Sequence, residues 1–379
     1  MAIIVKKFGG TSVDSIDKLS RIAEHIAFEK KRGDDIVVVV SAMGKTTDSL
    51  FQLAYEITKT PSQREMDMLL TSGERITMAL LSLSLQKLDI MSISFTGSQS
   101  GIITDNSHGN AKIININAFR IHEELNKGKV VIVAGFQGVS NEKEITTLGR
   151  GGSDTTAVAL ASFLKAKKCE IFTDVNGVYE ADPKIVPTAK RFDFMSPNEI
   201  LYMAFTGSKV LHARAAEFAY KYNIPVEIKS SFDYTEGTMI ENEIEKSIVK
   251  AISHKENIAI FKVDIEDKEI PSFYTEIFDI YITENIAKIY IDNKYLDKFI
   301  NELKSNNLIY EIDENRYTVI NLLGYRINRD IEFLSILHTN IKRICKSNYT
   351  IENQGIGVQI TVLFSETNSV IKYIYEEML

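Results

Sequence analysis

Short apolar segments alternate with longer amphipathic ones from the N-terminus to about residue 232. The apolar segments are typical of strands, and several are continuously apolar, as buried parallel strands are. They cover residues 2–8, 36–42, 91–97, 130–136, 169–174 and 225–230. This alternation of strand and helix predicts a mainly parallel sheet between layers of helices.

The amphipathic segments predict the helices. Ile16, Leu19, Ile22 and Ile26 recur at the spacing of one helix face, and residues 62–87 are expected to form one long helix.

The clearest start of a helix lies in residues 196–222. Ser196 is predicted as the N-cap, Pro197 as the first helical residue, and Glu199 as the residue that closes a capping box.

The pattern changes after a polar, turn-rich segment at residues 230–247. Strands are predicted at 287–292, 308–313, 317–324, 341–347 and 357–364, and helices at 294–305, 329–339 and 369–379. This order indicates two small α+β units of the βαββαβ type. We place the boundary near residue 245, which gives domains at 1–245 and 246–379.

Composition narrows the classes of protein. A chain of 379 residues with 44% hydrophobic and 25% charged residues is expected to form two or three globular domains. The net charge of -7, with no basic stripe, argues against nucleic-acid binding. Cys169 and Cys345 have the spacing of neither a zinc site nor a disulfide framework. Since no apolar run suits a signal peptide or a membrane span, we expect a cytoplasmic protein that binds no membrane.

A glycine-rich turn after a hairpin-like segment is the first candidate binding site. It runs directly into an apolar helical pattern and reads Gly149, Arg150, Gly151, Gly152, Ser153, Asp154. Bare backbone N–H groups, a helix start and a fixed cation favour an anion. A glycine-rich loop before a capped helix, with no ligand, accounts for the glycines and the polar residues but not for Arg150.

Polar and glycine residues also end the first two strands. Lys7 precedes Gly9 and Gly10, which lets phosphate oxygens approach the backbone beside a point charge, although alone this pattern also fits a turn at the end of a strand. The spacing is not that of the P-loop. Ser41 and Thr47 follow the second strand, at the sheet edge where open α/β sheets bind ligands.

Other charged residues have less decisive patterns. Glu74 lies in the middle of the predicted long helix, where an exposed surface charge is the ordinary interpretation. Asp174, Tyr179 and Lys184 combine an aromatic ring with charges behind a turn, as a nucleotide site would require. His212 is interpreted as a packing or surface residue rather than a catalyst.

Eight segments in order and spacing resemble the aspartokinases of the amino acid kinase superfamily. They are KKFGGTSV, VVSAMGKTTDSL, TSGERI, TGSQSGIITD, VIVAGFQGV, TTLGRGGSDTTAVALA, TDVNGVYEADPKIV and GSKVLHARAAEFA. The likeness runs from Ile3 to about Thr238, and KFGGTS together with GRGGSD is highly specific for this family. The resemblance implies a three-layer α/β sandwich followed by two ACT-like units, which match the two small units above.

The resemblance also implies roles for single residues. Those expected around ATP are Lys7, Gly9, Gly10, Ser41, Asp174, Tyr179, Lys184 and Lys209. Those expected around aspartate are Thr47, Glu74, Arg150, Gly151, Gly152, Ser153 and Asp154. Lys7, Asp154 and Lys209 would be catalytic, with Asp154 orienting the lysines and contacting Mg²⁺ or its waters. Lys184 stands where many relatives have arginine.

The implied reaction converts ATP and L-aspartate into ADP and 4-phospho-L-aspartate, the first step toward lysine, threonine and methionine. A carboxylate with a pKa of about 4 needs no general base at neutral pH, so catalysis would be positioning and charge neutralisation. Two alternatives stay open at this point. One is a related kinase for another amino-acid carboxylate, and the other is a non-catalytic regulatory subunit.

The C-terminal region departs from the family's effector loops. Ser272 follows Pro271 where a Pro-Gly pair is common, and the second loop, at 322–334, has neither proline nor a second glycine. We therefore expect these units to hold a homodimer together and to bring little feedback by lysine or threonine. A divergent but intact sensor is the alternative.

Overall fold

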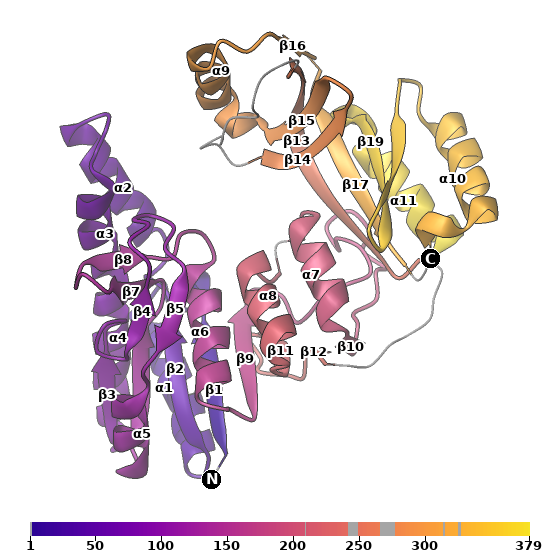
Figure 1. The fold of residues 1–379 in the computed structure, drawn as a ribbon. Helices are drawn as coiled ribbons and strands as arrows, with labels where there is room; N and C mark the ends of the chain where they lie inside the picture. The colour runs from indigo at the N-terminus through magenta and orange to yellow at the C-terminus, as the bar shows by residue number, and fades with distance from the viewer. Residues whose placement is uncertain (1, 209, 242–248, 266–276, 314, 325–326) are drawn as a thin grey trace. The chain divides into compact units, whose positions relative to one another are not determined.

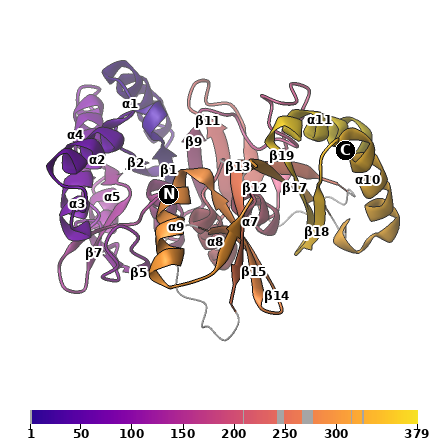
Figure 2. The same ribbon diagram turned by 90° about the horizontal axis from the view of Figure 1, so that it is seen from above.

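The computed structural model describes residues 2–208, 210–241, 249–265, 277–313, 315–324 and 327–379. The chain divides into two compact units, drawn as a ribbon in Figures 1 and 2. Unit 1 comprises Met1–Val178, Arg191–Ala204 and Lys209–Glu245, and unit 2 comprises Tyr179–Lys190, Phe205–Ser208 and Lys246–Leu379. The expected boundary at residue 245 lies outside the described residues, so domains at 1–245 and 246–379 stay a proposal.

Unit 1 is built on one eight-stranded sheet in the order β10-β12-β11-β9-β1-β2-β6-β3. The pairs from β11 through β9, β1, β2 and β6 to β3 are all parallel, and β12 runs antiparallel to β11. The mainly parallel sheet and all six predicted strands are confirmed. The strands are β1 (Ile3–Phe8), β2 (Asp35–Val40), β3 (Ser92–Phe95), β6 (Val130–Ala134), β9 (Lys168–Thr173), β10 (Phe194–Met195), β11 (Val226–Ser230) and β12 (Thr238–Ile240).

Helices cover both faces of this sheet. Apolar side chains of α1 and α4 pack with those of β1, β2 and β6 in one core, while α6 contacts the sheet together with α8. The helices are α1 (Ile16–Lys30), α2 (Thr46–Ile57), α3 (Gln63–Leu70), α4 (Ser72–Gln86), α5 (Phe119–Asn126), α6 (Gly152–Phe163), α7 (Pro197–Phe205) and α8 (Ala213–Tyr222). Leu19, Ile22 and Ile26 are buried as predicted, whereas Ile16 is 58% exposed because it is the first residue of α1.

Two helices replace the single one expected over residues 62–87. The break falls at Thr71, between α3 and α4. The Thr71 and Ser72 hydroxyls donate to the carbonyls of Met68 and Leu69, at 3.2 and 2.6 Å, which a continuous helix would need for its own N–H groups. The Gln137 side-chain amide also donates to the Thr71 carbonyl, at 3.1 Å. The break moves Glu74 from the middle of a helix into the first turn of α4.

The predicted capping box at the start of α7 is present. The Ser196 N–H donates to the Glu199 carboxylate at 2.8 Å, and the Glu199 N–H donates to the Ser196 hydroxyl at 3.3 Å. Pro197 is the first helical residue, where its missing N–H costs no hydrogen bond.

A small second sheet in unit 1 has the order β5-β4-β7-β8. Its strands are β4 (Ile102–Thr104), β5 (Ile113–Ile116), β7 (Gln137–Ser140) and β8 (Ile145–Thr147). The antiparallel pair of β7 and β8 forms the expected hairpin, and it leads directly into the glycine-rich turn.

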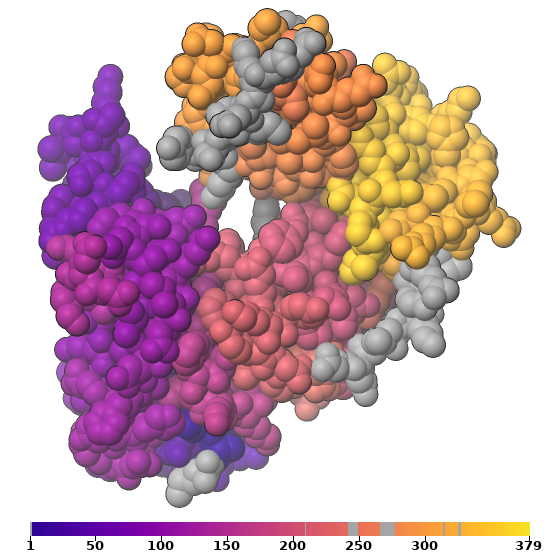
Figure 3. Space-filling view, viewed as in Figure 1, coloured from indigo at the N-terminus to yellow at the C-terminus, as the bar shows by residue number. Residues whose placement is uncertain are grey.

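Unit 2 contains one seven-stranded sheet in the order β14-β15-β13-β17-β19-β18, with β16 pairing to β13. Helix α9 packs on β13 and β15, while α10 and α11 pack on β17 and β19, so the sheet carries two cores. Figure 3 shows these two halves as adjoining orange and yellow surfaces. The elements are β13 (Ala251–Asp264), β14 (Ile277–Thr283), β15 (Ile286–Asp292), α9 (Leu296–Ser305), β16 (Tyr310–Ile312), β17 (Tyr317–Leu323), α10 (Ile331–Ile344), β18 (Thr350–Gln354), β19 (Gly357–Leu363) and α11 (Thr367–Met378).

One predicted strand in this unit is wrong. Residues 341–347 were expected as a strand, but α10 continues to Ile344. Phe333, Leu337 and Ile341 recur every four residues and are all buried, so the helix pattern extends through the segment. The strand that pairs with β19 is instead β18.

The two expected effector loops are described only in part. Pro271 and Ser272 lie outside the described residues. In the second loop, the Asp330 carboxylate accepts a hydrogen bond of 2.9 Å from the Phe333 N–H and caps α10. Across the described ranges, no helix is both long and apolar enough to cross a membrane.

Candidate active site

The carboxyl ends of β1, β2, β6 and β9 meet at one edge of the sheet in unit 1. Hydrogen bonds continue between the chain segments beyond the strands. The Ser41 N–H donates to the Phe8 carbonyl at 3.1 Å, and the Gly135 N–H donates to the Val40 carbonyl at 3.0 Å. The segments that follow these strands are therefore held side by side, at the edge where open α/β sheets bind ligands.

Lys7 and Asp154 form an ion pair at this edge. The Lys7 ammonium lies 2.6 Å from the Asp154 carboxylate, and both side chains are largely buried. A Cβ atom at Gly9 would lie only 3.2 Å from the Lys7 ammonium, so a glycine leaves the lysine room beside the turn. A Cβ atom at Gly10 would lie 3.0 Å from the Ala42 carbonyl oxygen, so this position also requires a small residue. The structure thus brings together the lysine, the two glycines and the carboxylate that the sequence predicted for the phosphate region.

Helix α6 begins at the predicted glycine-rich turn, and Gly151 is its N-cap with a φ of 66°. A Cβ atom at Gly151 would also lie 2.0 Å from the His212 ring, so both conformation and space require glycine. Ser153 and Asp154 lie in the first turn. The Gly152 N–H donates to the Gly149 carbonyl at 3.0 Å, and since no side chain of the described residues caps α6, the N–H groups of Ser153 and Asp154 are left for an anion. The His212 ring therefore lies against the turn, and its interpretation as a packing or surface residue rather than a catalyst stays a prediction.

The start of α6 lies against the end of β6. A Cβ atom at Gly135 would lie 2.8 Å from the Ser153 hydroxyl and 3.0 Å from the Ser153 Cα atom. One at Gly152 would lie 2.8 Å from the Phe136 ring. Sequence reasoning did not single out Gly135, because the partner that requires its small size is distant along the chain.

Glu74 is buried, so its interpretation as an exposed surface charge is wrong. Its side chain is only 3% exposed, and one carboxylate oxygen accepts a hydrogen bond of 3.1 Å from the Ala42 N–H. The other oxygen, Oε2, is buried and has no hydrogen-bond partner in the described part of the chain. Burial raises the pKa of Glu74 to about 7. A buried oxygen without a donor at a ligand-binding edge is suited to a ligand cation.

Residues 2–230 match the amino acid kinase family, which is more than half of the chain. Aspartokinase from Bacillus sp. strain MGA3 is 41% identical over 374 residues, which cover 95% of this chain and 87% of that protein. Aspartokinase 2 from Bacillus subtilis is 41% identical over 378 residues, 99% of this chain and 91% of that protein. The chain belongs to the aspartokinases. The resemblance inferred from the eight segments is confirmed.

Solved aspartokinase structures share the fold. E. coli aspartokinase III in complex with aspartate and ADP has a TM-score of 0.84 at 23% identity, with 99% of each chain covered. Aspartate kinase from Synechocystis is 30% identical, with a TM-score of 0.59, and the match covers 99% of this chain and 69% of that one. These likenesses confirm the predicted aspartokinase architecture.

Three other predicted residues of this aspartokinase are placed in unit 1 without decisive contacts. Arg150 is exposed and forms no ion pair with any described residue. Thr47 is half-buried in the first turn of α2. Asp174 is exposed directly after β9 and accepts a 3.1 Å hydrogen bond from the Thr173 hydroxyl. Their side chains leave room for a ligand, and their roles stay predictions.

Two of the remaining predicted nucleotide residues belong to unit 2. Tyr179 packs against the core of unit 2 that contains α10 and α11. Lys184, also in unit 2, is exposed, and its N–H donates to the Asp182 carboxylate at 2.9 Å. Lys209 lies outside the described residues. Contact of these three residues with a nucleotide therefore stays a prediction.

Two carboxylates follow strand and turn segments at this edge, Asp154 and Asp174. No group of three or more His, Cys, Asp or Glu residues is placed to hold a metal within the described ranges. Mg²⁺ is usually held by one or two carboxylates together with substrate phosphates and water, so such a group is not needed. Asp154 follows the glycine-rich turn and Asp174 follows β9, and these carboxylates fit that pattern.

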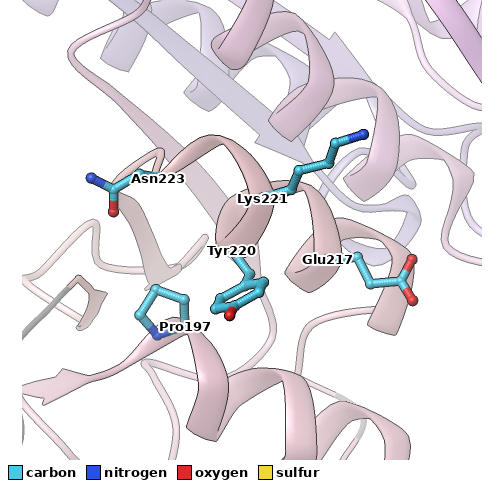
Figure 4. A pocket seen from close by; sticks show the side chains of 5 residues that line it. All are labelled: Pro197, Glu217, Tyr220, Lys221 and Asn223. Carbon is cyan, nitrogen blue, oxygen red and sulfur yellow. The ribbon is translucent and has the colours of Figure 1, made fainter.

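A pocket elsewhere in unit 1 shares no residue with this edge. Figure 4 shows its lining of Pro197, Glu217, Tyr220, Lys221 and Asn223. Four of the five lie on or next to α8, and the Tyr220 ring lies beside Pro197. The charges there belong to Glu217 and Lys221, which are four residues apart along the helix, a spacing common on solvated surfaces.

Proposed function

We propose that this chain transfers the γ-phosphoryl group of ATP to the side-chain carboxylate of L-aspartate, giving 4-phospho-L-aspartate and ADP. The observation that carries the proposal is the buried Glu74 carboxylate, with one oxygen bonded to the backbone at the carboxyl edge and the other open. An amino-acid ammonium would complete its hydrogen bonds. Membership of the aspartokinases supports aspartate as that amino acid.

The remaining contacts to aspartate follow from the chemistry of the turn. Arg150 would bind the α-carboxylate through two parallel hydrogen bonds, and its lack of an ion partner among the described residues leaves it available. Gly151 and Gly152 let the substrate lie against the backbone. Thr47 and Ser153 supply hydroxyl groups.

Phosphoryl transfer needs two anions to approach each other. The aspartate side chain is already ionised at neutral pH, so no general base is required. Lys7 and the N–H groups of Gly10 and the α6 start would stabilise the charge on the phosphoryl oxygens, while Asp154 orients Lys7. When bound with ATP, Mg²⁺ would supply further neutralisation, held through Asp154 or its waters. Ser41, Asp174, Tyr179, Lys184 and Lys209 are proposed for the nucleotide.

Hydroxamate formation tests this function. The protein is incubated with ATP, Mg²⁺ and hydroxylamine together with L-aspartate, L-glutamate or N-acetyl-L-glutamate. We expect efficient trapping of the acyl phosphate only from L-aspartate. Faster turnover of either other acid would contradict the substrate assignment, and ATP binding without any hydroxamate would indicate a non-catalytic subunit.

The pKa of Glu74 makes a testable prediction for aspartate binding. In the free protein Glu74 becomes ionised as the pH rises through about 7, because burial has raised its pKa. Only the ionised form pairs with an ammonium, so the KM for aspartate should fall about tenfold between pH 6 and pH 8. The same shift means that Glu74 stabilises the unliganded fold below its unfolded pKa, and that this contribution is lost as the pH rises through about 7.

The variant Glu74→Gln should raise the KM for aspartate and remove this pH dependence, as steady-state kinetics across the pH range will show. Glu65→Gln is a matched control, since Glu65 is exposed on α3 and pairs with Arg64. An unchanged pH profile in Glu74→Gln would show that Glu74 does not contact the ammonium.

We also propose that unit 2 joins two chains into a homodimer and that lysine or threonine inhibits weakly. The Asp330 cap supports weak inhibition, since it occupies the Phe333 N–H group at the start of α10 that an effector carboxylate could otherwise use. Sedimentation velocity of the full chain and titration of activity with each amino acid test the two statements. A monomer, or strong cooperative inhibition, would contradict them.

A cytoplasmic location stays a prediction.

A further inference from the structure

The mechanism above does not use Asp67, a fully buried carboxylate on α3. Its side chain accepts hydrogen bonds from three directions. The Thr147 hydroxyl donates at 2.5 Å, the Gly109 N–H at 3.1 Å, and the His108 Nδ1 atom lies 2.7 Å away.

These bonds join three segments just before the glycine-rich turn. Thr147 is the last residue of β8, and its carbonyl accepts a 2.8 Å hydrogen bond from the Ala111 N–H. Asp67 therefore ties α3 to the end of β8 and to the loop of His108 and Gly109. Two residues after Thr147 the chain enters the turn that carries Arg150.

The turn itself lies directly on the same loop. Gly149 has a φ of 75°, and a Cβ atom there would lie 2.9 Å from the Asn110 side chain and 3.1 Å from the Gly109 carbonyl. Arg214 of α8 donates to the Leu148 carbonyl and, at 3.1 Å, to the Asn110 side chain. A displacement of the loop would therefore be transmitted to the turn.

Burying a carboxylate costs desolvation free energy, so stability alone does not explain why a carboxylate joins these segments. Within the described ranges Asp67 has no lysine or arginine partner, and its ion-pairing partner is His108. Apolar side chains of similar volume often stabilise a fold equally well. The carboxylate makes directional hydrogen bonds, which fix the angle and register of the β8 end and of the His108–Gly109 loop relative to α3.

We infer that Asp67 is a positioning residue for the substrate: through Thr147 and the loop of His108 and Gly109 it holds the Gly149–Gly151 turn so that Arg150 meets the α-carboxylate of aspartate. The inference rests on the proposed function. A shift of about 1 Å in a substrate-positioning group can lower activity by up to about 100-fold.

The variant Thr147→Val tests this role, because it removes the hydroxyl donor while nearly keeping the shape of a side chain that is 1% exposed. We expect the KM for aspartate to rise about tenfold, with the KM for ATP within about twofold of wild type and a near-normal kcat. Thr147→Ser keeps the donor and should restore the low KM. Arg150→Ala serves as a reference and should show the same selective defect to a greater degree.

The readouts separate positioning from stability. A purely structural role would lower the melting temperature and the active fraction but leave both KM values unchanged, and this result would overturn the inference. Equal increases in the two KM values would overturn it as well. If Thr147→Val does not fold, Asp67→Asn is measured in the same way with the same expected outcome. Wild-type hydroxamate formation is measured first, so failure of the proposed function is recognised independently of the variants.

Discussion

Replacing Lys7 by alanine is expected to lower kcat for aspartyl hydroxamate formation by roughly 100- to 1,000-fold, or about 2.7–4 kcal/mol of transition-state stabilisation. The ammonium is the charge that the structure places beside Gly9 and against Asp154, largely shielded from water. In such an environment a preorganised cation stabilises developing phosphoryl charge far more than it would in water. The variant also leaves Asp154 as an uncompensated negative charge near the incoming phosphates.

Steady-state hydroxamate assays at saturating ATP and aspartate measure this loss. Lys31→Ala is the control, because Lys31 is exposed at the end of α1 and should retain normal kcat. Lys7→Arg keeps a charge but not a compact ammonium, so its activity should lie between those of alanine and wild type. A near-normal kcat in Lys7→Ala would remove Lys7 from the phosphoryl site.

The second large effect concerns stability and the neighbouring residue, Lys6. Successive side chains of a strand point to opposite faces, so Lys6 lies on the face opposite Lys7. It is fully buried, pairs with the Glu170 carboxylate of β9, and lies 2.7 Å from the Glu29 carboxylate of α1. Lys6→Met should lower the free energy of unfolding by about 3–5 kcal/mol, since it leaves a buried carboxylate without its main partner.

Urea unfolding of the full chain, followed by a signal from unit 1, measures this change. The double variant Lys6→Met/Glu170→Met should be less destabilised than Lys6→Met alone, because it also removes the buried carboxylate that has lost Lys6. Equal unfolding midpoints for Lys6→Met and wild type would show that the buried pair contributes no net stability.

The same pair predicts an acid dependence. Burial alone would raise the pKa of Glu170, but Lys6, Lys229 and Lys168 outweigh it and hold the pKa at about 2. Because this value lies below the unfolded value of about 4.3, the contribution of Glu170 is present above that pH and is lost as the pH falls toward 2. Lys6→Met should therefore lose less stability than wild type on acidification.

The contrast between Lys6 and Lys7 illustrates what sequence could predict. The apolar runs were enough to predict the strands of the parallel sheet, whereas the position of Lys7 before two glycines indicated a phosphate site only together with the resemblance, because the same pattern also fits a turn at a strand end. Nothing local distinguishes Lys6, because its partner Glu170 is 164 residues away in the chain. The ion pair is a product of strand order, which periodicity does not determine.

The burial of Glu74 and Asp67 also depends on contacts with residues that are distant along the chain. Helical periodicity runs through residues 62–87. The break at Thr71 depends on side-chain hydrogen bonds to backbone carbonyls, including one from Gln137 on strand β7. Without the break, Glu74 is a surface charge. Asp67 could not be recognised as buried, since the loop that covers it is about 40 residues further along the chain, as the 41-residue separation from His108 shows.

In unit 2 the strand predicted at residues 341–347 was wrong for a reason that lies within the segment itself. Residues 341–347 have only three apolar positions, Ile341, Ile344 and Cys345, and Ile341 continues the spacing of Phe333 and Leu337. So short an apolar segment does not distinguish strand from helix by itself, and the packing of α10 on the sheet shows which of the two forms.

A crystal structure of the protein with L-aspartate and a non-hydrolysable ATP analogue tests the central claim most directly. We predict that the aspartate ammonium lies within about 3.2 Å of the Glu74 Oε2 atom, with the α-carboxylate at similar distances from the Arg150 guanidinium and the side-chain carboxylate directed toward the terminal phosphate beside Lys7. Aspartate bound with its ammonium away from Glu74, or with its side-chain carboxylate in contact with Arg150 and turned from Lys7, would contradict this account.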